Sequence, residues 1–152
     1  MFALKDEYMQ AALEEAQKAY DLKEVPIGAI VIKDGNIIGR GHNLKEMRKD
    51  STAHAEIIAL QQASAFLGNW RLSGCELYVT LEPCPMCAGA IQQARIERIF
   101  FGAYDEKAGC CGSLYNIPED SRFNHQVEVI GGILEQQCSW ILKDFFQHKR
   151  QK

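Results

Sequence analysis

Two short stretches of this sequence carry one imidazole, two thiols and one carboxylate at spacings that suit metal chemistry. They are His54-Ala55-Glu56 and Pro83-Cys84-Pro85-Met86-Cys87. Two thiolates and a neutral imidazole match the borderline-soft zinc ion, and the two thiolates cancel its charge. Three protein ligands leave the fourth tetrahedral position open, as in catalytic sites, and water bound there has its pKa lowered to about 7. His54, Cys84 and Cys87 are therefore the predicted zinc ligands, and Glu56 is the predicted proton carrier.

The spacing of these residues places them at the starts of two helices. Residues two apart do not share a helix face, so His54 and Glu56 reach one site only if it lies over the N-terminal end of their helix. Ser51-Thr52 are the predicted N-cap residues, which puts Glu56 near the capping-box position. Cys84 and Cys87 are three apart and share one face of a second helix start, where partial positive charge stabilises thiolates. Two helix starts are expected to meet at one ion.

Taken singly, each of these signals also has an ordinary structural explanation. A lone His packs or lies at the surface, Cys-x-x-Cys serves redox pairs and structural zinc sites, and a helical Glu is commonly solvated. The combination favours catalytic zinc. Of the other cysteines, Cys75 and Cys138 stand in apolar contexts and are expected to be buried. Cys110-Cys111 are expected to be ordinary residues of a Gly-flanked loop, although a fourth zinc ligand there would close the site.

Length and charge limit the class of protein. The 152 residues suit one domain spanning 1–152, and the formal net charge of -3 argues against a strongly basic nucleic-acid coat while allowing a local basic patch. We see neither a cationic leader followed by an apolar core nor an apolar run of about 20 residues. The expected location is the cytoplasm, with no membrane association.

The remaining sequence predicts the elements that position these residues. Helices are expected over about 5–22, 53–67, 85–94 and 134–149, and strands over 28–32, 37–41, 76–80, 99–102 and 127–130. Asp34-Gly35 indicates a hairpin, and residues 42–51 a loop. Helices separate the second, third and fourth strands, which should be parallel. The predicted fold class is α/β: a three-layer α/β/α sandwich around a five-stranded mixed sheet, with both zinc helices opening at its carboxyl end.

The motifs extend beyond the metal group. His-Ala-Glu followed by Pro-Cys-Pro-Met-Cys is the known signature of the cytidine deaminase-like zinc deaminases. Within them, the chain resembles the bacterial tRNA-specific adenosine deaminases over nearly its whole length. The matching stretches are Gly41-His42-Asn43, Thr52-Ala53-His54-Ala55-Glu56, Tyr78 to Cys84, Met86-Cys87-Ala88-Gly89-Ala90, Phe101-Gly102-Ala103, Asn124-His125 and Phe145-Phe146.

The resemblance implies a cytidine deaminase-like fold and hydrolytic deamination of adenosine to inosine at wobble position 34 of a tRNA anticodon. By motif position, the resemblance implies that His54, Cys84 and Cys87 are the zinc ligands and that Glu56 carries the protons. It also places Asn43, Ala55 and Asp105 near the target nucleotide, and it implies a homodimer with one zinc ion per subunit. Two departures are visible: Cys110-Cys111 replace small aliphatic residues, and Ser51 stands where proline is frequent.

An RNA partner sets further expectations. The target base must leave its stack, at a lower cost in a single-stranded anticodon loop. Candidate phosphate contacts, each equally interpretable as an ordinary solvated side chain, are Lys45, Arg48 and Lys49 before the first zinc helix and Lys143, Lys149, Arg150 and Lys152 at the C-terminus. Phe145 or Phe146 could stack on a base, although helical spacing puts at least one in the core.

Two other functions use the same residues. One is deamination of a free base or nucleoside, such as guanine or cytosine, with the same zinc chemistry. The other is a non-catalytic, zinc-stabilised module that binds RNA or protein. The second requires a fourth protein ligand, for which Cys110, Cys111 and His125 are the candidates.

Overall fold

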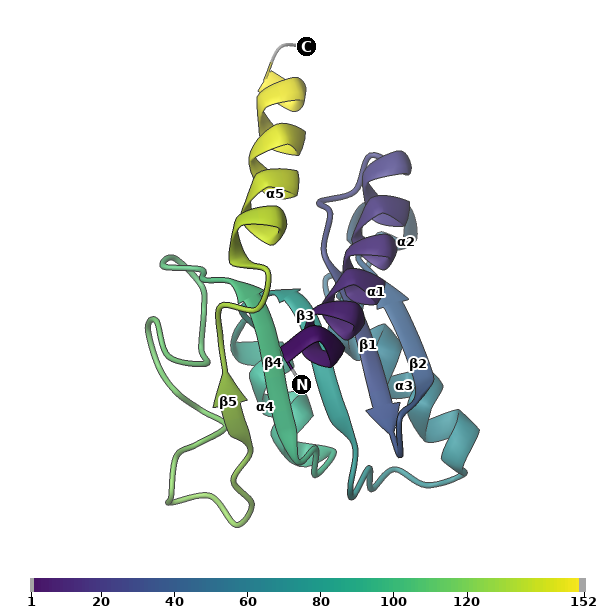
Figure 1. Cartoon of the computed structure of the whole chain (residues 1–152), viewed down its shortest axis with the longest axis vertical. Coiled ribbons are helices and arrows are strands. Elements are labelled where there is room, and N and C mark those ends of the chain that lie inside the picture. Colours follow the sequence, from purple (N-terminus) through teal and green to yellow (C-terminus); the bar gives the residue numbers. More distant parts are fainter. Residues whose placement is uncertain (1, 151–152) are drawn as a thin grey trace.

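A computed structural model describes the backbone of residues 2–150 and the side chains of residues 4–149. Within these residues the chain forms five helices and five strands (Figure 1). The helices are α1 Phe2–Asp21, α2 Lys45–Arg48, α3 Ala55–Leu67, α4 Pro85–Gln93 and α5 Glu135–Arg150. The strands are β1 Gly28–Lys33, β2 Asn36–His42, β3 Glu76–Leu81, β4 Arg98–Ala103 and β5 Glu128–Ile130. Of the predicted basic positions, Lys152 and the side chain of Arg150 lie outside the described residues.

The five strands form one mixed sheet in the order β2-β1-β3-β4-β5. β1 is antiparallel to both β2 and β3, whereas β3, β4 and β5 are parallel to one another. The β1–β2 hairpin turns at Asp34 and Gly35, with φ of 50° and 78°. Two successive positive φ values are those of a two-residue type I′ turn, so the predicted hairpin is confirmed.

The strands predicted to be parallel do run in one direction, but they are not all neighbours. β2 pairs with β1 and not with β3, because β1 pairs along both of its edges and separates them. The tight hairpin places β1 and β2 side by side, and the connection through α3 returns the chain to the other edge of β1. As a result, β2, β3 and β4 all end at the same edge of the sheet.

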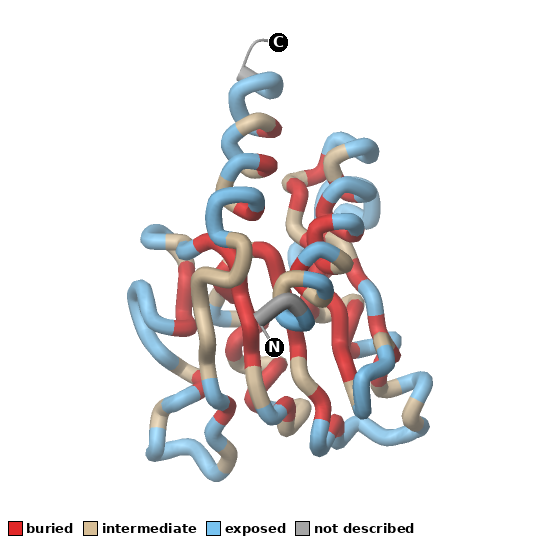
Figure 2. Tube along the Cα trace, viewed as in Figure 1, coloured by how far each residue is buried: buried red, intermediate tan, exposed pale blue. Residues whose placement is uncertain are grey.

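Helices cover both faces of the sheet, which gives the expected three layers. On one face α3 and α4 pack against Val31, Val79 and Phe101; on the other, α1 and α5 pack against Ile30 and Phe100. In Figure 1, α1 lies in front of the sheet, α3 and α4 lie behind it, and α5 runs upward beyond the upper ends of the strands. The buried residues follow the strands and the inner faces of the helices (Figure 2). The apolar area buried between these layers is the main stabilising term of such a sandwich.

A glycine fixes how closely α3 approaches the sheet. A Cβ atom at Gly41 of β2 would lie 2.3 Å from the carbonyl oxygen of Ala55 and 2.7 Å from the backbone nitrogen of Ala59. Both distances are impossible for a real side chain. Glycine is therefore required here for the first turn of α3 to pack directly on β2.

The expected N-cap of this helix is wrong. α3 begins at Ala55, and its N-cap is His54, which makes no side-chain capping hydrogen bond. The Asp50 carboxylate instead accepts hydrogen bonds from the backbone N–H and the hydroxyl of Thr52, at 2.8 and 2.7 Å, so Thr52 belongs to a separate turn. The stretch predicted as a loop also contains the four-residue helix α2.

α1 and α5 meet at their C-terminal halves. The Tyr20 hydroxyl donates a hydrogen bond of 2.5 Å to Asp144, and its ring packs on Phe145 with centroids 5.5 Å apart. Phe145 is buried, as expected for at least one of the two C-terminal phenylalanines, whereas Phe146 is 40% exposed. None of the described helices combines the length and the apolar character needed to cross a membrane.

Candidate metal and catalytic site

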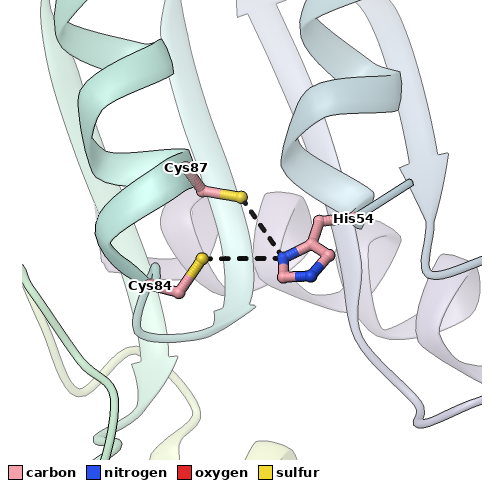
Figure 3. A group of neighbouring side chains, drawn as sticks. All are labelled: His54, Cys84 and Cys87. Atoms are coloured by element: carbon pink, nitrogen blue, oxygen red, sulfur yellow. Dashed lines mark hydrogen bonds between the residues drawn. The ribbon is translucent and has the colours of Figure 1, made fainter. Parts of the chain in front are cut away.

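Three donor side chains meet where α3 and α4 begin. His54 is the N-cap of α3, Cys84 is the N-cap of α4, and Cys87 lies in the first turn of α4, after Pro85 at its first position. Neither N-cap side chain makes a capping hydrogen bond, and both point into the space between the two helix starts (Figure 3). The shared edge at which β2 and β3 end places the two helix starts together.

The distances among the donor atoms match those around a tetrahedral ion. His54 Nδ1 lies 3.6 Å from Cys84 Sγ and 3.5 Å from Cys87 Sγ, and all three atoms are within 4.8 Å of one another. Bond lengths of about 2.3 Å to sulfur and 2.0 Å to nitrogen, at the tetrahedral angle, require an N···S separation of about 3.5 Å. The three side chains therefore fit a zinc ion, while their role as ligands remains a prediction.

The three groups share protons in a way that favours metal binding. Hydrogen bonds with Cys87 and, more weakly, with His54 lower the pKa of the Cys84 thiol to about 4. The hydrogen bond between His54 and Cys84 raises the pKa of His54. The Cys87 thiol donates its proton to Cys84, and this hydrogen bond together with burial raises the pKa of Cys87. The lowered pKa of Cys84 favours the thiolate, which is the form that binds a cation, and a bound cation would displace the remaining protons.

Glu56 occupies the second position of α3, beside this group. Its side chain is buried, with 4% of the residue exposed. Burial raises the pKa of Glu56 to about 7, and the negative charge of Cys84 adds to the effect. A carboxyl group that titrates near neutral pH can both accept and donate a proton, which is the requirement for general acid-base catalysis.

Comparisons with known proteins agree with this geometry. The MafB19-like deaminase family matches residues 4–150. A tRNA-specific adenosine deaminase of Bacillus subtilis (strain 168) is 52% identical over 145 residues, which cover 95% of this chain and 90% of that protein. This chain belongs to the tRNA-specific adenosine deaminase family. Identity at this level over almost the whole length extends well beyond the metal-binding motif.

Solved structures give the same result for the fold of this family member. One, from a study of A-to-I editing by tRNA:A34 deaminases at the wobble position of transfer RNA, superposes with a TM-score of 0.86 at 43% identity. The superposition covers 90% of this chain and 99% of that chain. A guanine deaminase from Nitrosomonas europaea superposes with a TM-score of 0.81 at 25% identity, covering 92% of this chain and 83% of that one. The predicted cytidine deaminase-like α/β sandwich is confirmed.

The other predicted site residues lie at the same end of the sheet. Asn43 follows β2 and is buried; its amide donates to the Val25 carbonyl at 3.2 Å and its oxygen accepts from the Lys45 N–H at 3.1 Å. Asp105 follows β4, and one carboxylate oxygen accepts from the N–H groups of Lys107 and Ala108, each at 3.1 Å. Both side chains are thus held by their own loops. Their contact with a nucleotide remains a prediction.

Ala55 is buried at the first position of α3. The N–H groups of a first helical turn have no partner within the helix, so the Ala55 N–H can serve a ligand.

Two buried glutamates that the sequence analysis missed hold the loops around this site. Glu82, 2% exposed, accepts four hydrogen bonds of 2.5–3.1 Å: from the N–H groups of Asp105, Cys111 and Ser113 and from the Ser113 hydroxyl. A Cβ atom at Gly109 would lie 2.3 Å from the Glu82 carboxyl carbon, so this glycine allows the loop to close over the carboxylate. An acidic residue directly after a buried strand was the available signal.

Glu24, 1% exposed, plays the same part for α2. Its two carboxylate oxygens accept from the N–H groups of Glu46 and Met47, at 3.0 and 2.6 Å. These amides belong to the first turn of α2, which follows Asn43 by two residues. Glu24 thereby fixes the segment that carries Asn43.

The candidates for a fourth protein ligand are engaged elsewhere. Cys110 Sγ contacts the Ala108 carbonyl at 3.7 Å, Cys111 packs in the core, and His125 Nε2 lies 2.9 Å from the Ile96 carbonyl. Across the described residues, the metal-compatible group of His and Cys side chains has three members. This arrangement disfavours the closed, non-catalytic zinc module. Cys75 and Cys138 are buried, as predicted.

Proposed function

We propose that this protein converts adenosine to inosine at wobble position 34 of a tRNA anticodon by hydrolysis, with one zinc ion per subunit held by His54, Cys84 and Cys87. The observation that carries the proposal is the tetrahedral spacing of these three donors beside a buried carboxyl group whose pKa is about 7. The names of the relatives at about 50% identity specify the substrate.

The donor set fits zinc by both chemistry and spacing, and it leaves one tetrahedral position for solvent. When bound, zinc supplies Lewis acidity and lowers the pKa of water to about 7.

Glu56 moves the protons of the reaction. Water adds its oxygen to C6 of adenine and the amino group leaves as ammonia, so one proton must be taken from water and delivered to a ring nitrogen, and a further proton must reach the leaving amine. Glu56 accepts and returns these protons and ends the cycle unchanged. A positioned general acid-base group contributes about two to four orders of magnitude in rate.

A cavity at this end of the molecule supports an RNA substrate. Its volume is about 880 Å³, and it extends from the Asp105 loop to α5. Lys107 and Lys143 line it together with Tyr104 and Phe146, which are 50% and 40% exposed. The carboxylates of Asp105, Glu106 and Glu135 line it as well, so the exposed rings rather than net charge are its main feature for RNA. Cations and exposed rings are the groups that bind phosphates and unstacked bases of single-stranded RNA. Lys45, Arg48 and Lys49, all exposed, add charge near α2.

Asn43, the backbone of Ala55 and Asp105 complete the proposal as contacts to the target nucleotide. We also propose a homodimer, as the resemblance implies, working in the cytoplasm, where its tRNA substrate is found. Light scattering of the purified protein measures the subunit number directly.

One experiment tests the function. The zinc-loaded protein is incubated with an anticodon stem-loop carrying adenosine at position 34, and inosine is measured by nucleoside analysis. Glu56→Ala is the matched control, since it removes the proton carrier and keeps the metal donors. The likeness to a guanine deaminase makes ammonia release from guanine and cytosine the second assay. Turnover of a free base without formation of inosine in RNA would overturn the proposal.

A further inference from the structure

A polar cavity of about 480 Å³ lies at the opposite end of the sheet from the metal group. Three loops converge there, each leading into one of the parallel strands β3, β4 and β5. Since β3 and β4 each have six residues, the cavity is about 20 Å from the metal group. No group at this distance touches the target base, so the catalytic site does not account for the residues that line the cavity.

Two arginines of this cavity share one aromatic ring. The guanidinium carbons of Arg71 and Arg95 lie 5.1 and 5.9 Å from the centroid of the Trp70 ring. Attraction between a guanidinium and an indole face holds each side chain in place, and the two positive charges are thereby kept within about 11 Å of each other. Such a pair is electrostatically unfavourable without an anion, particularly at low salt.

The surrounding groups are mostly hydrogen-bond donors. Among the described residues, neither Arg71 nor Arg95 forms a salt bridge, whereas the one acidic residue of the lining, Glu97, is held by Arg98 at 2.9 Å. Arg95 NH1 donates to the carbonyls of Gln92 and Gln93, at the C-terminal end of α4, which leaves its other N–H groups for a ligand.

The same cavity contains further donors and a nearby cation. The amide of Asn124 and the hydroxyl of Ser73 line it, whereas the amide nitrogen of Gln126 already donates to the carbonyls of Asp120 and Phe123. Lys33 reaches the same loop, with Nζ 3.4 Å from the Ser73 carbonyl. Guanidinium groups surrounded by neutral donors are the usual means of binding a phosphate.

We propose that Arg71 and Arg95 bind a backbone phosphate of the tRNA outside the nucleotide that is deaminated. This inference rests on the proposed function for the identity of the RNA, while the phosphate chemistry follows from the cavity itself. The site would add affinity for the tRNA without taking part in deamination.

The test measures RNA binding rather than turnover. The Glu56→Ala protein, loaded with zinc, is titrated with a full-length tRNA carrying adenosine 34 by fluorescence anisotropy at several salt concentrations. Arg71→Gln and Arg95→Gln in this background are each expected to weaken binding about three- to tenfold at 0.1 M salt. The double variant, which removes the whole phosphate contact, should reduce the slope of log K against log salt by about 0.7–0.9, and each single variant should reduce it by a smaller amount.

Control variants separate the site from net charge and from folding. Arg40→Gln removes one positive charge from a partly exposed arginine on β2 and is expected to leave the slope unchanged. Arg95→Lys keeps the charge, so it should retain most of the salt slope. Arg71→Gln removes no hydrogen bond that the structure shows, so weaker RNA binding by this variant would not be due to a loss of folding. Unchanged affinity and slope in both arginine-to-glutamine variants would overturn the inference.

Two further outcomes show whether the phosphate belongs to tRNA or to a small anion, and whether RNA binding by the two arginines holds without the proposed function. If millimolar inorganic phosphate protects the protein against thermal unfolding through Arg71 while tRNA binding does not depend on Arg71, the cavity binds a small anion and the RNA assignment is wrong. If the wild-type protein forms no inosine, the proposed function fails, yet the binding titration still decides whether the two arginines contact RNA.

Discussion

Glu56 and Glu82 are two buried carboxyl groups within a few residues of the metal donors, and they differ in their hydrogen-bond partners and in the direction in which their pKa is shifted. Glu56 is 4% exposed and Glu82 is 2% exposed. Burial raises the pKa of Glu56 to about 7. Burial acts in the same direction on Glu82, but the hydrogen bonds from Ser113, Asp105 and Cys111 outweigh it and hold the pKa of Glu82 below its usual range.

The difference shows what turns a buried carboxyl into a catalyst or an anchor. Removal from water destabilises the charged form, which makes the proton easy to keep and to return. A cluster of backbone amides stabilises the same charged form and at the same time ties a loop to the carboxylate. Glu24, with two amides of α2, belongs with Glu82. The Glu56 environment suits proton transfer, and the Glu82 environment suits structure.

The largest effect is expected from removing one of the metal donors that lie beside Glu56. Cys87→Ala leaves two donors, too few to hold zinc tightly, so both zinc and deamination should be lost. Elemental analysis of the purified variant measures the metal. Cys138→Ala, at a buried cysteine outside the group, is the control and should keep its zinc. Full zinc occupancy in Cys87→Ala would remove Cys87 from the ligand set.

Glu56→Gln should lower the rate of inosine formation by about two to four orders of magnitude, because the amide cannot carry a proton. Zinc content and resistance to urea should remain close to those of the wild-type protein. Single-turnover kinetics on the anticodon stem-loop give the rate. A variant that still turns over rapidly would show that another group carries the proton.

Glu82→Gln should act on stability. The amide nitrogen cannot accept hydrogen bonds, so two of the four are lost and buried N–H groups are left unsatisfied, at a cost of about 2–4 kcal/mol. Ser113→Ala removes only the hydroxyl donor and should cost about 1 kcal/mol. Urea unfolding of the zinc-loaded proteins measures both, and equal costs for the two variants would contradict the anchoring role.

The smallest effect concerns Glu15, a fourth buried glutamate, which is paired with cations rather than amides. Burial would raise the pKa of Glu15, but hydrogen bonds from Lys18 and His42, at 2.7 and 3.1 Å, lower it below the usual value. A depressed folded-state pKa stabilises the protein above the unfolded-state pKa of about 4.3, and this stabilisation is lost as the pH falls through the folded-state pKa.

Glu15→Gln should therefore cost about 1–2 kcal/mol at pH 7 and progressively less below about pH 4. Urea midpoints at several pH values provide the measurement. A difference between wild type and variant that stays constant from pH 7 to pH 3 would show that charge at Glu15 contributes nothing.

Much of the site could be predicted because its chemistry depends on residue types and on their short spacings in the sequence. One imidazole, two thiols three residues apart and a carboxyl beside the imidazole fit few other functions, and local geometry places each at a helix start. Alternating and helical periodicities predicted the hairpin and the four long helices to within a few residues. These signals depend on neighbours in sequence, and so does the family resemblance that goes with them.

Only the tertiary structure decided which strand lies between β2 and β3, that His54 and Cys84 themselves form the N-caps, and that Cys110, Cys111 and His125 are engaged away from the metal group. It also paired Glu82 with a loop more than twenty residues away and brought Arg71 and Arg95 to one ring. The reason is physical: burial, and the partners that a buried group acquires, depend on segments distant in sequence, and they determine whether a glutamate carries a proton or holds a loop.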